Sequence, residues 1–329
     1  MSAPKQERLT LTFDQFELIM QKTTELTSNL HVDGTWLTMT GGEPLMNSDY
    51  KKMIEGSPEY NVKGIALVTN STLITEKVAR ELEQLNVAEV MISLDGATAE
   101  TNDLIRGRGT FEKVMKAIEV LKQTDMFVGA TLTLTTYNMN EIEPYIDLCF
   151  EKGLNYAWVN PPVYTGRLPE SEIAISYRDH VEIMEKVKRL DLKYFKYGFG
   201  VYYNVPYYSL TDPVSPYTDL NTACPWGRSN LTIKTDGSVL PCLYSRDLVL
   251  GNVFTDSLTN IFFHPILENF RNLSSLEEPC KSCSHLWFCG GCRARTFYLT
   301  GDWMAHDPWC PLTQGVKEEE MKVKVGDRN

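Results

Sequence analysis

Short apolar runs alternate with amphipathic stretches along the first 190 residues, and this alternation most constrains the fold. The apolar or β-branched runs cover residues 36–40, 64–69, 90–94, 128–135 and 156–160. Amphipathic stretches lie at residues 75–85, 111–123 and 140–152. Runs that are apolar throughout are typical of parallel strands buried on both faces. Strand–helix–strand repetition at this spacing predicts an α/β fold with a parallel sheet, open or closed into part of a barrel.

The chain begins with a predicted helix, not a strand. Thr12 and Gln15 form a capping-box pattern. The apolar residues that follow at helical spacing are Phe13, Phe16, Ile19 and Met20. In a repeat that otherwise runs strand then helix, this start implies that one strand is missing or is supplied elsewhere.

The composition excludes several classes of partner. The 329 residues include 43 Asp and Glu against 32 Lys and Arg, a formal net charge of −11 at pH 7. This charge argues against nucleic acid or an anionic membrane as the main partner, because phosphate binding needs clustered cations. No apolar run approaches the length of a membrane span, and the polar segment from Met1 to Arg8 leads into no apolar segment. We therefore predict a cytoplasmic protein with no nucleic-acid or membrane partner.

Residues 194–217 are rich in aromatic side chains and are interrupted by prolines. We favour the interpretation that they form a strand and a connector whose rings pack into a core between two domains. The alternative is that some of the rings line a substrate cavity between those domains. The rings concerned are Tyr197, Phe199, Tyr202, Tyr203, Tyr207 and Tyr208.

Two further segments carry local signals. Asp236-Gly237 separates apolar runs at 231–234 and 238–240, which predicts a β-hairpin. The tail beyond Gly315 mixes glutamates with lysines, which predicts a solvated helix or a frayed end.

Seven of the eight cysteines lie between Cys224 and Cys310. In a reducing compartment such a group indicates metal ligands, not disulfides. Four of them form a C-x2-C-x5-C-x2-C pattern, namely Cys280, Cys283, Cys289 and Cys292. Seven ligands exceed the four of one tetrahedral site, so two centres are expected. Spacing alone leaves zinc and iron–sulfur equally open, since His285 also lies beside the group. Cys149, alone on a predicted helix, is expected to be a small buried hydrophobe.

Polar motifs follow successive predicted strands. They are Thr40-Gly41-Gly42-Glu43-Pro44, Thr69-Asn70-Ser71-Thr72 and Ser93-Leu94-Asp95-Gly96, with Arg106-Gly107 later in the third connection. The carboxyl ends of parallel strands are where such folds build ligand sites. Paired glycines let the backbone approach a ligand closely, and Glu43 can accept from an ammonium group. Each motif alone is also ordinary turn or capping chemistry, but their recurrence at successive strand ends favours a binding site.

With these motifs the sequence resembles the radical S-adenosylmethionine enzymes that carry a C-terminal SPASM domain, over residues 11–310. Gly41-Gly42-Glu43-Pro44 matches the motif that holds the amino group of S-adenosylmethionine in that family. Ser93, Asp95 and Arg106 stand where the family has elements associated with the ribose and carboxylate of the cofactor. The cofactor-binding residues implied by the resemblance are Gly41, Gly42, Glu43, Pro44, Asn70, Ser93, Asp95 and Arg106.

The resemblance also implies the domain organisation. It predicts a partial (β/α)6 TIM-like barrel over residues 1–215, without its first strand. A small iron–sulfur SPASM domain would follow over residues 216–315, and a charged tail over residues 316–329.

The cysteines match the SPASM signature in two halves. Cys224, Gly237 and Cys242 match the first half, and the five cysteines from Cys280 to Cys310 match the second. The match implies two auxiliary 4Fe-4S clusters. One would be held by Cys224, Cys242 and Cys292, and the other by Cys280, Cys283, Cys289 and Cys310. Two departures stand out. Two residues separate Cys289 from Cys292 where the common pattern has three, and the first cluster has only three cysteines, which leaves its fourth position open or filled by another group.

The family's defining C-x3-C-x2-C loop is absent from the 329 residues. In the family its three thiolates hold the 4Fe-4S cluster that reductively cleaves S-adenosylmethionine, so radical initiation is expected to fail without it. Two explanations compete, a chain truncated at its start and a degenerate relative that kept its shape and its auxiliary clusters. We favour truncation, because the cofactor-side residues are all present and because losing a core strand exposes its neighbours.

The resemblance implies a function in maturation. The complete enzyme would make a 5'-deoxyadenosyl radical and abstract hydrogen from a substrate between the domains. Residues 289–295 and 301–310 are similar to the haem-maturation branch. The implied partners are a peptide or a cofactor precursor such as haem, and an electron donor such as flavodoxin or ferredoxin. Two other classes stay open, a non-catalytic iron–sulfur electron carrier or scaffold and a zinc-stabilised binding module.

Overall fold

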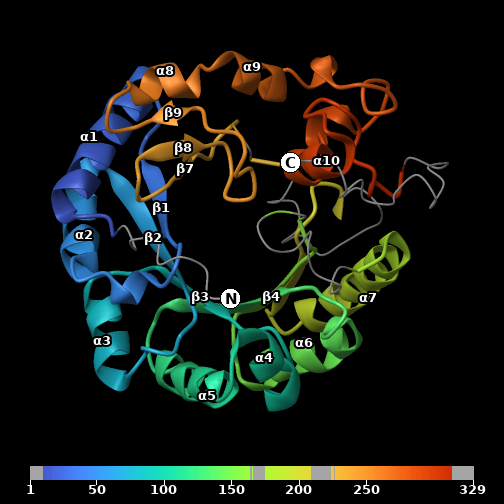
Figure 1. Ribbon diagram of the computed structural model, residues 1–329. Coiled ribbons are helices and arrows are strands. Elements are labelled where there is room, and N and C mark those ends of the chain that lie inside the picture. Colours follow the sequence, from blue (N-terminus) through green and yellow to red (C-terminus); the bar gives the residue numbers. More distant parts are fainter. Residues whose placement is uncertain (1–9, 164, 166–174, 209–223, 226, 313–329) are drawn as a thin grey trace, which may run out of the picture.

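A curved parallel sheet, with helices on its outer side, forms most of a ring that the C-terminal half completes (Figure 1). The computed structural model describes residues 10–163, 165, 175–208, 224–225 and 227–312. The helices are α1 (Phe13–Asn29), α2 (Tyr50–Gly56), α3 (Glu76–Gln84), α4 (Ala99–Arg106), α5 (Thr110–Leu121), α6 (Ile142–Glu151), α7 (Tyr177–Phe195), α8 (Leu258–Phe262), α9 (Pro265–Arg271) and α10 (Arg293–Thr300). The strands are β1 (Thr35–Met39), β2 (Val62–Thr69), β3 (Glu89–Ser93), β4 (Phe127–Thr133), β5 (Tyr156–Asn160), β6 (Gly200–Tyr203), β7 (Thr232–Ile233), β8 (Ser238–Leu240) and β9 (Gly251–Asn252).

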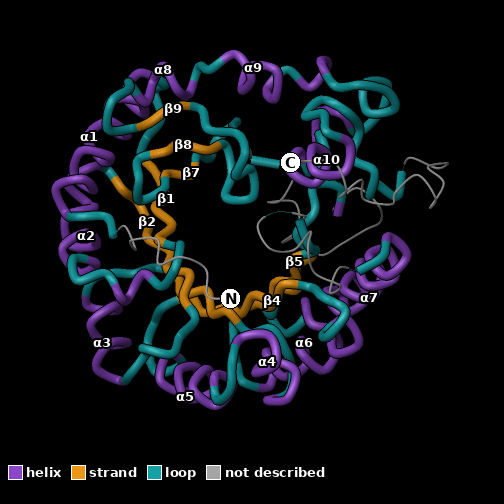
Figure 2. Tube along the Cα trace, viewed as in Figure 1, coloured by secondary structure: helices purple, strands orange, loops and turns teal. Residues whose placement is uncertain are grey.

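The main sheet follows the chain order, β1-β2-β3-β4-β5-β6, and every neighbouring pair is parallel. Strands line the inside of the ring and helices lie outside them (Figure 2). The predicted α/β fold with a parallel, partly closed sheet is therefore confirmed. The five predicted strands are β1 to β5, and each observed end lies within two residues of the predicted one.

Alternate residues of each strand pack against the outer helices. Val90 and Ile92 of β3 are fully buried in the main core with the apolar faces of α3, α5 and α6. Because side chains alternate along a strand, Glu89, Met91 and Ser93 point to the opposite, concave face. The concave face at the carboxyl ends of the strands is thus where polar residues can meet a ligand.

Helix α1 joins the two halves of the molecule. It begins with the predicted capping box between Thr12 and Gln15. On one side Phe16 and Met20 pack with Met53, and on the other side its apolar residues pack with the C-terminal half. Lys22 Nζ donates to the carbonyl of Val253 at 2.6 Å and to that of Asp256 at 2.8 Å.

The aromatic segment after α7 mostly forms core. Phe199, Tyr203, Tyr207 and Tyr208 are at most 2% exposed and belong to the main core, as the favoured interpretation predicted. This core also contains Trp309 and Cys310, so it extends from the sheet into the C-terminal half. Tyr197 is exposed, and its ring lies beside Phe150 at the edge of this core.

The predicted hairpin is present in the C-terminal half. Strands β7 and β8 pair antiparallel, with Thr232 opposite Leu240, and β9 adds a third strand. Gly237 has φ +83°, and a Cβ there would lie 2.3 Å from Asn252 Oδ1, so only glycine suits this turn. The predicted boundary at residue 215 and the tail at 316–329 lie outside the described residues. No helix in the described part of the chain is both long and apolar enough to cross a membrane.

Candidate functional site

The Gly-Gly-Glu-Pro motif lies directly after β1, at the carboxyl edge of the sheet. Gly41 has φ +107°, and a Cβ built at Gly41 or Gly42 would meet no described atom within 4 Å. Glu43 ties this turn to the next strand end, because Thr69 Oγ1 donates to one carboxylate oxygen at 2.7 Å and the Asn70 N–H to the other at 2.8 Å. Pro44 is buried and begins a short 3-10 turn. The backbone at the two glycines is therefore accessible, and the hydrogen bonds of Glu43 hold the turn in place.

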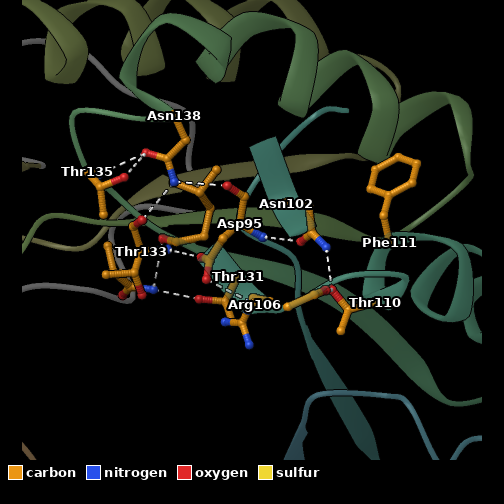
Figure 3. A network of polar contacts seen from close by, with 12 residues as sticks. Asp95, Asn102, Arg106, Thr110, Phe111, Thr131, Thr133, Thr135 and Asn138 are labelled. Carbon is orange, nitrogen blue, oxygen red and sulfur yellow. Dashed lines mark hydrogen bonds and ion pairs between the residues drawn. The ribbon is translucent and has the colours of Figure 1, made fainter. Parts of the chain in front are cut away.

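Asp95 and Arg106 form an ion pair after β3 (Figure 3). Asp95 is only 3% exposed. One of its carboxylate oxygens accepts from the Thr133 N–H at 2.7 Å, and the other lies 2.7 Å from Arg106 Nε. Burial raises the pKa of Asp95, and the Arg106 guanidinium opposes that shift. Both oxygens have partners within the protein, so Asp95 holds Arg106 in place.

Arg106 remains available at its outer end. Its side chain is 25% exposed, and Figure 3 shows its terminal nitrogens pointing away from the polar network. Ser71 lies after β2 with φ +63°, and its buried hydroxyl has no hydrogen-bond partner among the described residues. Ser93 ends β3, partly buried on the concave face. The turn after β1 supplies open glycine backbone and a carboxylate, and Asp95 after β3 holds the Arg106 guanidinium at the same edge. This set fits a ligand that carries both an ammonium and a carboxylate group.

Asn138 supports this edge, although sequence reasoning did not single it out. It is fully buried, and its amide nitrogen donates to the carbonyls of Asp95 at 3.0 Å and Thr133 at 2.9 Å. Its amide oxygen accepts from the Thr135 N–H at 2.8 Å. Asn138 therefore fastens the turn that carries Asp95 to the end of β4. Its position in a polar run after a predicted strand was the only signal for it.

The far wall of the concave face combines aromatic rings and amides. Trp158 of β5 and Tyr202 of β6 lie opposite each other in register, with ring centroids 5.9 Å apart. Toward the carboxyl edge, Asn204 Nδ2 donates to Asn160 Oδ1 at 2.8 Å, and Asn160 Nδ2 donates to Thr131 Oγ1. Tyr202 belongs to the aromatic segment, and its side chain lies on the concave face of the sheet. It is therefore the residue to which the alternative interpretation, rings that line a substrate cavity, applies.

The cysteines fall into two groups in space. Cys224, Cys242 and Cys292 pack around Ala294 in one apolar cluster that also includes Tyr244. Among the other four, Cys283 lies close enough to Cys280 to raise the pKa of its thiol, and Cys310 and Cys280 both act on Cys289. The pKa of Cys289 is raised to about 12, mainly by burial and to a lesser extent by Cys310 and Cys280.

Backbone donors already point at several of these sulfur atoms. The Gly291 N–H lies 3.3 Å from Cys289 Sγ, and the N–H groups of His285 and Tyr244 lie 3.4 Å from the sulfurs of Cys283 and Cys242. Such donors stabilise sulfur that carries negative charge. Within the described ranges, no three Cys, His, Asp or Glu side chains are close enough to hold a single metal ion. A 4Fe-4S cluster spreads its thiolates over four iron atoms, and the sulfur-directed N–H groups fit that kind of centre.

Comparison with known families decides the identity of this arrangement. Residues 17–149 match the model of the radical SAM superfamily, and residues 224–284 match the SPASM model, described as an iron–sulfur cluster-binding domain. An AdoMet-dependent heme synthase of Oleidesulfovibrio alaskensis is 30% identical over 292 residues, which cover 83% of this chain and 74% of that protein. The chain belongs to the radical SAM superfamily and carries a SPASM domain.

Other radical SAM proteins are similar over most of their length. An AdoMet-dependent heme synthase of Methanosarcina barkeri is 29% identical over 301 residues, which cover 85% of this chain and 83% of the relative. Among solved structures, anSMEcpe with bound AdoMet has the same fold, with a TM-score of 0.66 at 22% identity. That match covers 89% of this chain and 83% of the other.

A buried polar network connects the SPASM domain to the barrel, and sequence reasoning missed it. Arg295 and Asp307 form an ion pair and are at most 1% exposed. Burial alone would raise the pKa of Asp307, but Arg295 holds it below its usual value. Asp307 also accepts from the Cys292 N–H at 2.9 Å and from the Trp309 N–H at 3.1 Å. One carboxylate therefore fixes the backbone at Cys292 and next to Cys310.

The network continues into the last strands of the barrel. Arg295 Nη2 donates to the Tyr207 hydroxyl at 3.1 Å, and that hydroxyl donates to the Trp309 carbonyl at 2.8 Å. His180 of α7 contacts Tyr207 and Tyr203 through its two ring nitrogens at 2.8 and 2.7 Å. Burial lowers the pKa of His180 well below its usual value, and Arg295 lowers it further, so the ring stays neutral. The end of the main sheet and the C-terminal half thus share one hydrogen-bonded core.

Cys149 lies apart from the other cysteines. It is 1% exposed on α6 within the main core, as expected for a small buried hydrophobe. Burial raises the pKa of its thiol to about 12, which keeps it protonated. It serves below as the matched control for the ligand cysteines.

Proposed function

We propose that this chain binds S-adenosylmethionine at the carboxyl ends of β1, β2 and β3, and two auxiliary 4Fe-4S clusters through its seven clustered cysteines. We further propose that it acts in maturation of a haem precursor. The observation that carries the proposal is the joint position of the Gly-Gly-Glu-Pro turn and the Asp95-held Arg106 on one edge of the sheet. The roles of the individual site residues belong to this proposal.

In the cofactor site, the open backbone of Gly41 and Gly42 lets the methionine part of the ligand approach the turn. Glu43 Oε1 accepts from Thr69 Oγ1 and from the Leu45 N–H, and Oε2 accepts from the Asn70 N–H. A carboxylate offers about four acceptor positions, so it can still accept from the ligand's ammonium group. Arg106, held by Asp95, supplies the opposite charge for the ligand's carboxylate.

In the cluster sites, Cys224, Cys242 and Cys292 would hold one cluster and the other four clustered cysteines the second. The clusters supply a one-electron redox couple when bound. The chain's own part is to exclude water, to donate N–H groups to sulfur and to fix Cys292 through Asp307. An electron donor such as flavodoxin or ferredoxin remains a prediction.

The names of the relatives support a haem precursor as substrate. Two relatives that are similar to more than four fifths of this chain are AdoMet-dependent heme synthases. Trp158 and Tyr202 place two rings, tilted by 49° to each other, side by side on the concave face, and either ring can stack on an aromatic macrocycle. Quenching of tryptophan fluorescence by a porphyrin that carries free propionates would test this, with Trp158→Leu expected to weaken the quenching. Binding of a peptide in place of the porphyrin would contradict the substrate while leaving the cofactor proposal intact.

Calorimetry tests the cofactor site. We expect S-adenosylmethionine to bind the reconstituted protein, and Glu43→Ala to weaken binding by at least about tenfold. The reason is that each charged hydrogen bond contributes roughly 1.5–3 kcal/mol, and 1.4 kcal/mol is a tenfold change in affinity. Glu112→Ala removes an exposed carboxylate that pairs only with Lys116 in the described structure and should change nothing. Absence of binding at millimolar ligand, or equal loss in both variants, would contradict the assignment.

A further inference from the structure

Arg293, the first residue of α10, is buried with the N–H groups of two of its three guanidinium nitrogens unused. It is 3% exposed. Its Nη1 donates to the carbonyls of Trp303 at 2.9 Å and Ala305 at 2.7 Å, which fixes the plane of the guanidinium. Nε and Nη2 are buried and have no hydrogen-bond partner among the described residues. These two nitrogens form one edge of the planar fork, so their N–H groups point the same way.

Arg293 lines a small pocket to which both cysteine groups contribute. Cys224 of one group and Cys289 of the other line this pocket, together with Gly291 and Arg228. A Cβ on Gly291, which has φ +65°, would lie 2.7 Å from Arg293 Nη2, so the unused edge of the guanidinium lies against this glycine. Arg228 adds another buried nitrogen, Nη1, that also has no partner in the described part of the chain. Two arginines with buried, unpartnered nitrogens thus share one pocket with cysteines of both groups.

The buried charges of this region do not balance. Asp307 is the buried carboxylate here, and Arg295 already pairs with it. Arg293 therefore leaves a positive charge without a counter-ion among the described side chains. A buried charge and three unpaired N–H groups cost several kcal/mol unless an anion compensates them.

We propose that Arg293, assisted by Arg228, is a positioning residue that donates its free N–H groups to the sulfur atoms of the iron–sulfur clusters and raises their reduction potential. This inference rests on the proposed clusters. A cluster ligated by thiolates is an anion, and reduction adds one electron to it. A nearby cation and N–H···S hydrogen bonds stabilise the added negative charge, so the potential becomes less negative. Because Arg293 lines one pocket with Cys224 of one group and Cys289 of the other, its removal should shift both clusters.

Redox titration followed by electron paramagnetic resonance tests this on the anaerobically reconstituted full chain. We expect Arg293→Met to move the midpoint potentials to more negative values. Arg293→Lys, which keeps the charge but loses the fork, should shift them less. Arg228→Met, at a partly exposed residue, should shift them in the same direction. The matched control is Arg178→Met, which removes the same charge from an exposed pair with Glu182 on α7 and should leave the potentials unchanged.

The possible results distinguish a failure of the proposed arginine role from a failure of the proposed iron–sulfur clusters. Wild-type protein that takes up no iron would overturn the proposed clusters themselves. Wild-type protein with iron, and midpoint potentials that stay unchanged in both Arg228→Met and Arg293→Met, would overturn only the role of the two arginines. If Arg293→Met does not fold, the shift in Arg228→Met relative to Arg178→Met decides the question alone.

Discussion

Replacement of Arg295 by methionine should destabilise the protein by about 3–5 kcal/mol, because it leaves the buried Asp307 carboxylate without its counter-charge. Both side chains are essentially inaccessible to water. The substitution also removes a donor to the Tyr207 hydroxyl. Equilibrium unfolding in urea, with circular dichroism as the signal, measures the loss.

The controls for this prediction separate the ion pair from lost packing. Arg178→Met removes an exposed arginine and should change the free energy of unfolding by less than about 1 kcal/mol. The double variant Arg295→Met with Asp307→Leu removes both charges, so it should be less destabilised than the sum of the two single variants. A loss of under 1 kcal/mol in Arg295→Met, or strict additivity in the double variant, would show that the pair does not hold the two halves together.

Cys283→Ala should remove one cluster and leave the other, lowering the iron content from about eight atoms per chain to about four. The C-terminal half should also unfold at lower temperature, because metal binding there is coupled to folding. Iron analysis and thermal unfolding of the anaerobically reconstituted protein measure both effects.

Cys149→Ala is the matched control for that substitution. It removes a thiol that is buried in the barrel core on α6 and should keep about eight iron atoms. Equal iron contents in Cys283→Ala and wild-type protein would exclude Cys283 as a ligand. Equal losses in both variants would mean that iron uptake reports damage to the fold and not ligation.

The parallel sheet could be predicted from the sequence because its strands carry strong local signals. The strands β1 to β5 are continuous apolar or β-branched runs, and the Asp236-Gly237 turn is specific for a hairpin. Helices α4 and α7 were not predicted. The number of cysteines predicted two metal centres, and their spacing left zinc and iron–sulfur equally open. The division of the seven cysteines into two ligand sets came only from the family resemblance.

The remainder of the site depends on contacts between distant residues, which no local pattern reports. Asp95 looks like a ligand residue in the sequence, yet both of its oxygens are used within the protein. Arg295 meets Tyr207 from the other half of the chain, and nothing near either residue indicates this contact. The unused nitrogens of Arg293 could not be predicted from the sequence either. Only the fold shows that Nη1 donates to the carbonyls of Trp303 and Ala305.

The central claim is that the seven clustered cysteines hold two iron–sulfur clusters in a radical SAM chain. Iron and acid-labile sulfide per chain, measured on anaerobically reconstituted wild-type protein, test it most directly. The account predicts about eight iron and eight sulfide atoms, as expected for two 4Fe-4S clusters. A colourless protein with stoichiometric zinc and no iron would contradict it.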